Sequence, residues 1–151
     1  AAGSSFMYQA WKNSEDVVTK AAVPADTCAD SISAGLPRDR IKAMNAVTQT
    51  GGAYLSVSDD EILKAIPDLA RRTGVFAEPA GAASWAGVLQ AADRGLIGST
   101  DRVVMINTGS GLKDITAAMR AVEISGSDCF TIKPEINELD KIINQMKRVE
   151  P

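Results

Sequence analysis

Apolar and polar positions along the chain follow helical spacing in some segments and extended spacing in others. Residues 5–11 carry Phe6 and Ala10 one helical turn apart, which predicts a short helix. A second helix is predicted over residues 38–49, because Pro37 suits a first helical turn and a glycine pair follows the apolar stripe. The stretch between them keeps no sustained period and is predicted to be a loop with short ordered pieces.

The clearest helix signal is a capping box at Ser58 and Glu61. The Ser58 hydroxyl can accept a hydrogen bond from the amide three residues on, while the Glu61 carboxylate reaches back. A helix is therefore predicted from Asp59, with a bend at Pro67 and with Gly74 in the left-handed position after its end. Its predicted buried face consists of Ile62, Leu63, Ile66, Leu69 and Ala70.

A further helix is predicted from Pro79 to about Arg94 and is closed by Gly95. Its first half contains small residues, which allow another backbone or a flat ligand to approach closely. These residues are Ala80, Gly81, Ala82, Ala83 and Ser84. Shorter helices are predicted over residues 114–122 and after Pro134, the latter with Ile136, Leu139, Ile142, Ile143 and Met146 on one side.

Three segments have the composition of strands. Residues 53–57 are partly alternating and lie between turn residues, and residues 129–132 resemble an edge strand. Residues 102–107 form a nearly continuous apolar run of the kind that is buried on both faces of a parallel sheet. Because helices and strands alternate, the sequence predicts an α/β fold of three layers with a mostly parallel sheet.

The composition of the chain excludes several kinds of catalytic site and partner. The chain has 151 residues, 45% of them hydrophobic, which is room for one ordinary domain with a real core. It has no histidine, which excludes Ser-His-Asp and Cys-His catalysis and every imidazole metal site. A net charge of −3 disfavours nucleic acid as a partner, and no apolar stretch approaches the roughly 20 residues that span a bilayer. Cys28 and Cys129 lie far apart without a CxxC pair, which favours a reduced, cytoplasmic protein.

Two junctions are candidate ligand sites, because ligands of open α/β sheets bind beyond the carboxyl ends of the strands. The first is the glycine-rich turn 107–111, which brings the Thr108 hydroxyl to a strand end. It lacks the terminal Gly-Lys-Ser/Thr of a P-loop, and its spacing fits an ordinary strand-to-helix turn as well. The second is Glu78 at the start of a helix, where a plain cap is the alternative to a functional carboxylate.

Other polar clusters have simpler explanations. The acidic run 59–61 is better explained by helix capping than by metal binding, and no metal site is expected. Arg71 and Arg72 fit a solvated last turn of a helix. Cys28 fits a small loop or core residue better than a nucleophile, since no base of the usual kind exists.

Four runs of residues carry a specific resemblance. They are ADSISAG (29–35), GGAYLSVSDDEI (51–62), GVFAEPAGAA (74–83) and TGSGLKD (108–114). In this order they resemble the C-terminal portion of threonine synthases, members of the fold type II, tryptophan synthase β-like, pyridoxal-phosphate enzymes. The resemblance covers about residues 1–122 and implies part of a catalytic domain, with residues 123–151 as a C-terminal extension.

The resemblance implies pyridoxal 5'-phosphate as the cofactor. Thr108 takes the place of the hydroxyl residue that hydrogen-bonds the pyridine nitrogen, while Glu78 and Gly35 correspond to segments that flank the ring. A hydroxyl partner does not hold that nitrogen protonated, so the ring is a tempered electron sink.

The implied reaction converts O-phospho-L-homoserine and water to L-threonine and phosphate. The family's Schiff-base lysine and phosphate-binding loop lie in an N-terminal portion that this chain lacks. Lys113 does not occupy that lysine's position. No catalytic residue is therefore assigned here, and the chain alone is expected to be inactive. The expected partners are the missing N-terminal portion, a small phosphorylated amino-acid substrate and a second copy in a homodimer.

Two alternatives stay open. A related fold type II enzyme, such as an amino-acid dehydratase or a cysteate-type synthase, would share the same motifs. From a different class, the chain could be a non-catalytic α/β module that serves binding or assembly.

Overall fold

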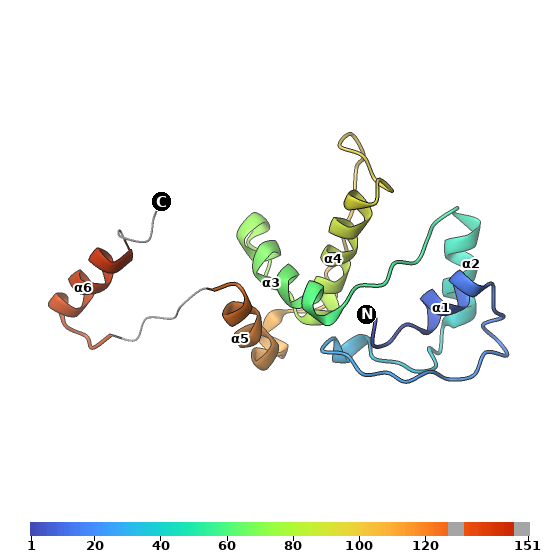
Figure 1. Cartoon of the computed structure of the whole chain (residues 1–151), viewed down its shortest axis with the longest axis horizontal. Coiled ribbons are helices and arrows are strands. Elements are labelled where there is room, and N and C mark those ends of the chain that lie inside the picture. The colour runs from blue at the N-terminus through green and yellow to red at the C-terminus, as the bar shows by residue number, and fades with distance from the viewer. Residues whose placement is uncertain (127–131, 147–151) are drawn as a thin grey trace.

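A computed structural model describes residues 1–126 and 132–146. In these ranges the chain forms six α-helices and two single-turn 3₁₀ helices. In chain order they are α1 (Phe6–Asn13), η1 (Asp30–Ile32), α2 (Arg40–Gln49), α3 (Asp59–Thr73), α4 (Pro79–Asp93), η2 (Gly111–Lys113), α5 (Ile115–Ile124) and α6 (Ile136–Met146). In Figure 1, α3, α4 and α5 form the central part, α1 and α2 lie beyond them, and α6 lies apart.

The helix α3 begins and ends at the residues that its capping signals predict. The Ser58 hydroxyl accepts a hydrogen bond from the Glu61 amide at 3.3 Å, and the Glu61 carboxylate accepts one from the Ser58 amide at 2.6 Å, so the predicted capping box is confirmed. The helix continues through Pro67 to its last turn. Gly74 follows with a φ of 74°, a left-handed conformation that glycine adopts without a steric penalty.

The main core lies between α3 and its neighbours α4 and α5. Large side chains on α3, among them Ile62 and Leu63, are fully buried. The facing positions on α4 and α5 are mainly alanines: Ala80, Ala82, Ala86, Ala117 and Ala121. Small residues on two helices and large ones on the third allow close packing without many aromatic side chains.

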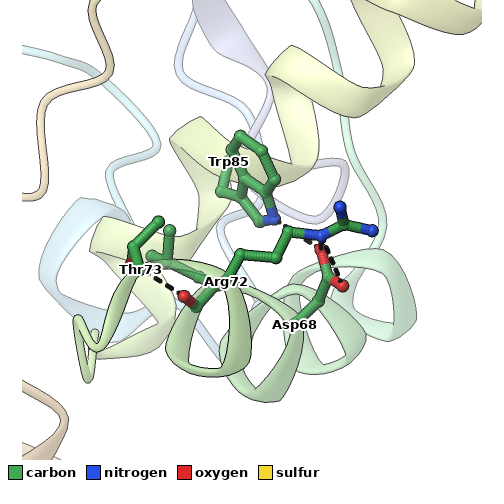
Figure 2. A network of polar contacts seen from close by, with 5 residues as sticks. Asp68, Arg72, Thr73 and Trp85 are labelled. Carbon is green, nitrogen blue, oxygen red and sulfur yellow. Dashed lines mark hydrogen bonds and ion pairs between the residues drawn. The ribbon is translucent and has the colours of Figure 1, made fainter.

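A polar network fastens α3 to α4 at the edge of this core (Figure 2). The Trp85 indole N–H on α4 donates a hydrogen bond to the Asp68 carboxylate on α3 at 2.9 Å. The Arg72 guanidinium, one turn further along α3, donates to both oxygens of the same carboxylate at 2.9 and 3.0 Å. The hydrogen bond from Trp85, opposed in part by burial, together with Arg72 lowers the pKa of Asp68 below its usual value.

A second, smaller core belongs to the N-terminal part of the chain. It consists of Phe6, Ala10 and Val17, with Met7, Val23 and Met44 packed against them. The predicted helix over residues 5–11 is therefore confirmed. The helix predicted over 38–49 is also present as α2, but none of its residues is fully buried.

The parallel sheet predicted from the sequence is not confirmed, since the described residues contain no strand. Residues 53–57 run without regular secondary structure, and so do residues 102–107. The latter segment was expected to be buried on both faces, yet Val104 is 88% exposed and Ile106 is 70% exposed. A strand exists only through hydrogen bonds to a neighbouring strand, and the described chain supplies no neighbour for either segment.

The C-terminal part contains the predicted amphipathic helix. α6 carries Ile136, Leu139 and Ile143 at helical spacing, and each of these side chains is exposed. The edge strand predicted over residues 129–132 lies almost entirely outside the described residues. Among the helices that the structure describes, none combines the length and apolar character needed to cross a membrane.

Candidate functional site

The two junctions that the sequence marks as candidate sites lie side by side. An isolated antiparallel bridge joins the segment before α4 to the glycine-rich turn after residue 107. The Glu78 amide donates a hydrogen bond to the Gly109 carbonyl at 3.0 Å, and the Gly111 amide donates to the Phe76 carbonyl at 3.0 Å. Tertiary structure thus brings Glu78 and the Thr108 turn to one place.

Glu78 is the buried charged residue of this site. It immediately precedes α4 and is only 4% exposed, but its carboxylate makes no hydrogen bond to the amides of that helix. Glu78 is thus the N-cap residue of α4 by position, but its side chain does not cap the helix through a hydrogen bond. Its Oε2 atom instead lies 2.9 Å from the Nζ atom of Lys113, in the single turn η2.

Sequence reasoning did not assign Lys113 to the site. From the sequence, Lys113 fits neither the lysine of a P-loop nor the position of the Schiff-base lysine. The one available signal is that residues 74–83 contain a single acidic residue, Glu78, and residues 108–114 contain a single basic residue, Lys113. That signal is weak, because the sequence does not show which charges meet.

Glycines make the close approach of the two segments possible. A Cβ atom on Gly109 would lie 2.0 Å from Oε1 of Glu78, and one on Gly81 would lie 2.0 Å from Oδ1 of Asn107. The small-residue half of α4 thus contacts the turn through Gly81, as the sequence predicted for a close neighbour. A further link is the Ser84 hydroxyl, which donates to the carbonyl oxygens of Gly81 and Ile106 at 2.6 and 3.1 Å.

Thr108 is exposed in the middle of this turn. Within the described part of the chain, its hydroxyl makes no hydrogen bond, although hydrogen bonds hold the neighbouring backbone on both sides. An exposed hydroxyl on a fixed backbone fits a donor to a heterocyclic ring nitrogen. The residues present therefore fit the pyridine edge of a pyridoxal ring.

Gly35 is held by a different part of the chain. Its carbonyl accepts a hydrogen bond from the Val23 amide at 3.0 Å, and a Cβ atom at this position would lie 2.3 Å from the Val23 carbonyl oxygen. These contacts explain why glycine is needed here. They do not link Gly35 to Glu78 or Thr108.

Cys28 lies beside the start of α3. Its amide donates to Asp59 at 2.8 Å, and the Thr27 hydroxyl donates to the same carboxylate at 2.5 Å. Burial and the neighbouring Asp59 carboxylate raise the pKa of the Cys28 thiol to about 11. A thiol that stays protonated at neutral pH is a poor nucleophile, which supports the structural interpretation of this residue.

Comparison with known proteins identifies the class. The sequence model of the pyridoxal-phosphate dependent enzyme family matches residues 1–109, which include Thr108 and Glu78. The chain belongs to this family, and its cofactor is pyridoxal 5'-phosphate.

Within that class, the similar proteins are threonine synthases. The chain is 39% identical over 121 residues to the threonine synthase of Methanocaldococcus jannaschii, an alignment that covers 80% of this chain and 29% of that enzyme. It is 43% identical over 114 residues to that of Methanosarcina acetivorans, covering 76% and 28%. The threonine synthase of Mycobacterium tuberculosis is 44% identical over 95 residues, covering 63% and 26%. The chain thus spans less than a third of the length of these relatives.

Proposed function

We propose that this chain forms one side of the active site of a threonine-synthase-like enzyme, which converts O-phospho-L-homoserine and water to L-threonine and phosphate. The observation that carries the proposal is the exposed hydroxyl of Thr108, which has no hydrogen-bond partner among the described residues and lies on the turn that is bridged to the segment of Glu78. The names of the similar proteins support threonine as the product. The resemblance of the motifs implies the substrate.

The chemistry of such a reaction comes from the pyridoxal ring, which withdraws electrons from the substrate when it is bound. This chain's own part is to bind and orient that ring. Thr108 donates a hydrogen bond to the pyridine nitrogen, and because a hydroxyl does not protonate that nitrogen, electron withdrawal stays moderate. Glu78 and Gly35 are proposed to flank the ring.

The chain by itself is proposed to be inactive. The resemblance places the Schiff-base lysine and the phosphate-binding loop in the part of the relatives that precedes the matched segment, and Lys113 is already paired with Glu78. Phosphate release from O-phosphohomoserine is measured for the purified chain and for the chain mixed with the preceding part of a similar threonine synthase. We expect turnover only in the mixture. Turnover by the chain alone would contradict the assignment of the lysine.

The substitution Thr108→Val tests the cofactor contact in the complete enzyme. It keeps the shape of the side chain but removes the hydroxyl, so we expect cofactor affinity to fall about tenfold, the size of one lost hydrogen bond to a buried partner. Affinity is measured from the visible absorbance of the bound cofactor. Thr100→Val, at an exposed loop position, is the matched control and should bind as the wild type does. Equal affinity of both variants would show that Thr108 belongs to an ordinary turn.

We also propose that residues 1–122 contribute to the catalytic domain and that residues 123–151 are an extension of it. The family match over residues 1–109 supports the first part. The position of α6 apart from the other helices supports the second for residues 136–146 (Figure 1), whereas residues 123 and 124 complete α5.

A further inference from the structure

The two side chains of the ion pair between Glu78 and Lys113 differ in their exposure to solvent. The Glu78 side chain is 6% exposed, whereas the Lys113 side chain is 60% exposed. Within the described residues, Lys113 is the one cation that pairs with the Glu78 carboxylate. A surface ion pair contributes little, but a buried carboxylate that loses its cation keeps the cost of desolvation without compensation. Loss of the Lys113 cation would therefore act mainly by leaving the buried Glu78 carboxylate without a partner.

Glu78 also contacts the turn 107–111, which contains Thr108. Its amide bonds to the Gly109 carbonyl, and its Oε1 atom occupies the space that a side chain at Gly109 would need. Thr108 is the residue directly before Gly109. Both the backbone and the side chain of Glu78 thus lie against the backbone next to the Thr108 hydroxyl.

We propose that Lys113 is a positioning residue for cofactor binding: by pairing with buried Glu78, it holds the 107–111 turn so that the Thr108 hydroxyl is fixed for the pyridine nitrogen. This inference rests on the proposed role of Thr108. Lys113 needs no contact with the cofactor for this role, and it is distinct from the lysine that reacts with the cofactor.

The test uses the complete enzyme and measures cofactor affinity by absorbance titration. Lys113→Gln removes the cation, and we expect affinity to fall about fivefold to tenfold, as for loss of about 1 kcal/mol. Lys113→Arg keeps the cation and should bind within about twofold of the wild type. Lys64→Gln, the same change at an exposed position of α3, is the matched control and should bind as the wild type does.

A second measurement separates positioning from general stability. In the cofactor-free protein, hydrogen exchange at the Glu78 and Gly111 amides reports the two bridging hydrogen bonds directly. We expect faster exchange at both amides in Lys113→Gln than in Lys64→Gln. Unchanged exchange together with unchanged affinity would overturn the inference, as would a Lys113→Arg variant as weak as Lys113→Gln.

The double variant Glu78→Gln/Lys113→Gln keeps the proposal falsifiable if Lys113→Gln folds poorly, because it leaves no unpaired buried carboxylate. If Lys113 acts through Glu78, adding Lys113→Gln to Glu78→Gln changes cofactor affinity by less than about twofold. An equal loss in both backgrounds would overturn the inference. If the wild type binds the cofactor but releases no phosphate from O-phosphohomoserine, only the proposed reaction fails, because the affinity measurements still test Lys113.

Discussion

At the scale of single residues, small side chains decide how closely the segments of the site approach. Gly81 and Gly87 are both in α4, but their surroundings differ. A Cβ atom on Gly81 would meet the Asn107 side chain at 2.0 Å, whereas a Cβ atom on Gly87 would meet nothing within 4 Å. The same amino acid therefore serves close packing at one position and has no packing role at the other.

This contrast predicts opposite effects of one substitution within one helix. Gly87→Ala should raise the free energy of unfolding by about 0.5–1 kcal/mol, because alanine favours the helix over glycine. Gly81→Ala should lower it by about 1 kcal/mol, because the Asn107 side chain must move and lose the hydrogen bond that it accepts from the Gly109 amide. Urea denaturation of the two variants provides the measurement. A stabilising Gly81→Ala would show that the turn is not packed against α4.

At the scale of elements, the helices form where local signals are strong, and polar side chains then fasten them together. The capping box and Gly74 set the two ends of α3 without help from other elements. The network of Asp68, Arg72 and Trp85 joins α3 to α4 (Figure 2). A carboxylate that accepts hydrogen bonds from two helices stabilises their packing most while it is ionised, because hydrogen bonds to a charged acceptor are stronger.

The substitution Asp68→Asn tests how the Asp68 carboxylate joins α3 to α4, because its effect on the free energy of unfolding should depend on pH. The pKa of Asp68 is lowered in the folded state, so its stabilising contribution is present above the unfolded pKa near 4 and is lost as pH falls through the folded value. We expect the variant to be less stable than the wild type by about 1 kcal/mol at pH 7, because charged hydrogen bonds are the stronger ones. The difference should shrink steadily below about pH 4. The measurement is chemical denaturation across pH.

The control for that experiment is Asp26→Asn, which removes an exposed carboxylate without a described side-chain contact. It should change stability by less than about 0.5 kcal/mol at every pH. A pH-independent difference for Asp68→Asn would mean that shape, rather than charge, joins α3 to α4.

At the scale of the whole molecule, much apolar surface is left uncovered. Val104 and Ile106 are the clearest examples, because both belong to the segment with the strongest strand composition. Isolated exposed apolar residues are ordinary, but a run of them marks a surface that another segment covers. We infer that residues 102–107 pair with a strand supplied by the rest of the enzyme.

Val104→Lys tests this inference. In the chain alone the side chain is 88% exposed, so we expect the free energy of unfolding to change by less than about 0.5 kcal/mol. Association with the preceding part of a similar threonine synthase should weaken at least about tenfold, because the inferred pairing would bury a lysine. Leu96→Lys, at a loop residue that is 57% exposed, is the control and should associate normally. Equal association of both variants would place the missing strand elsewhere.

The helices were predictable because their signals lie within a few residues of one another. Ser58 with Glu61, Pro79 at a first turn and Gly74 at a last turn each act through contacts inside one helix, so sequence alone reveals them. The candidate residues Thr108 and Glu78 were also proposed from sequence, first from the two junctions between predicted elements and then through motif resemblance. Their adjacency was not, because the bridge between them joins segments that are distant along the chain.

The sequence by itself determined the class of enzyme, both ends of α3, the first turn of α4 and the residue types available for chemistry, since these follow from local pattern and from ordered motifs. Only the tertiary structure decided that Glu78 pairs with Lys113, that Thr108 is left exposed and that residues 102–107 have no strand partner within the described chain. The physical reason is the range of the interactions. Capping and helical periodicity act over one or two turns, whereas an ion pair with a buried carboxylate and the pairing of strands depend on which distant segments meet.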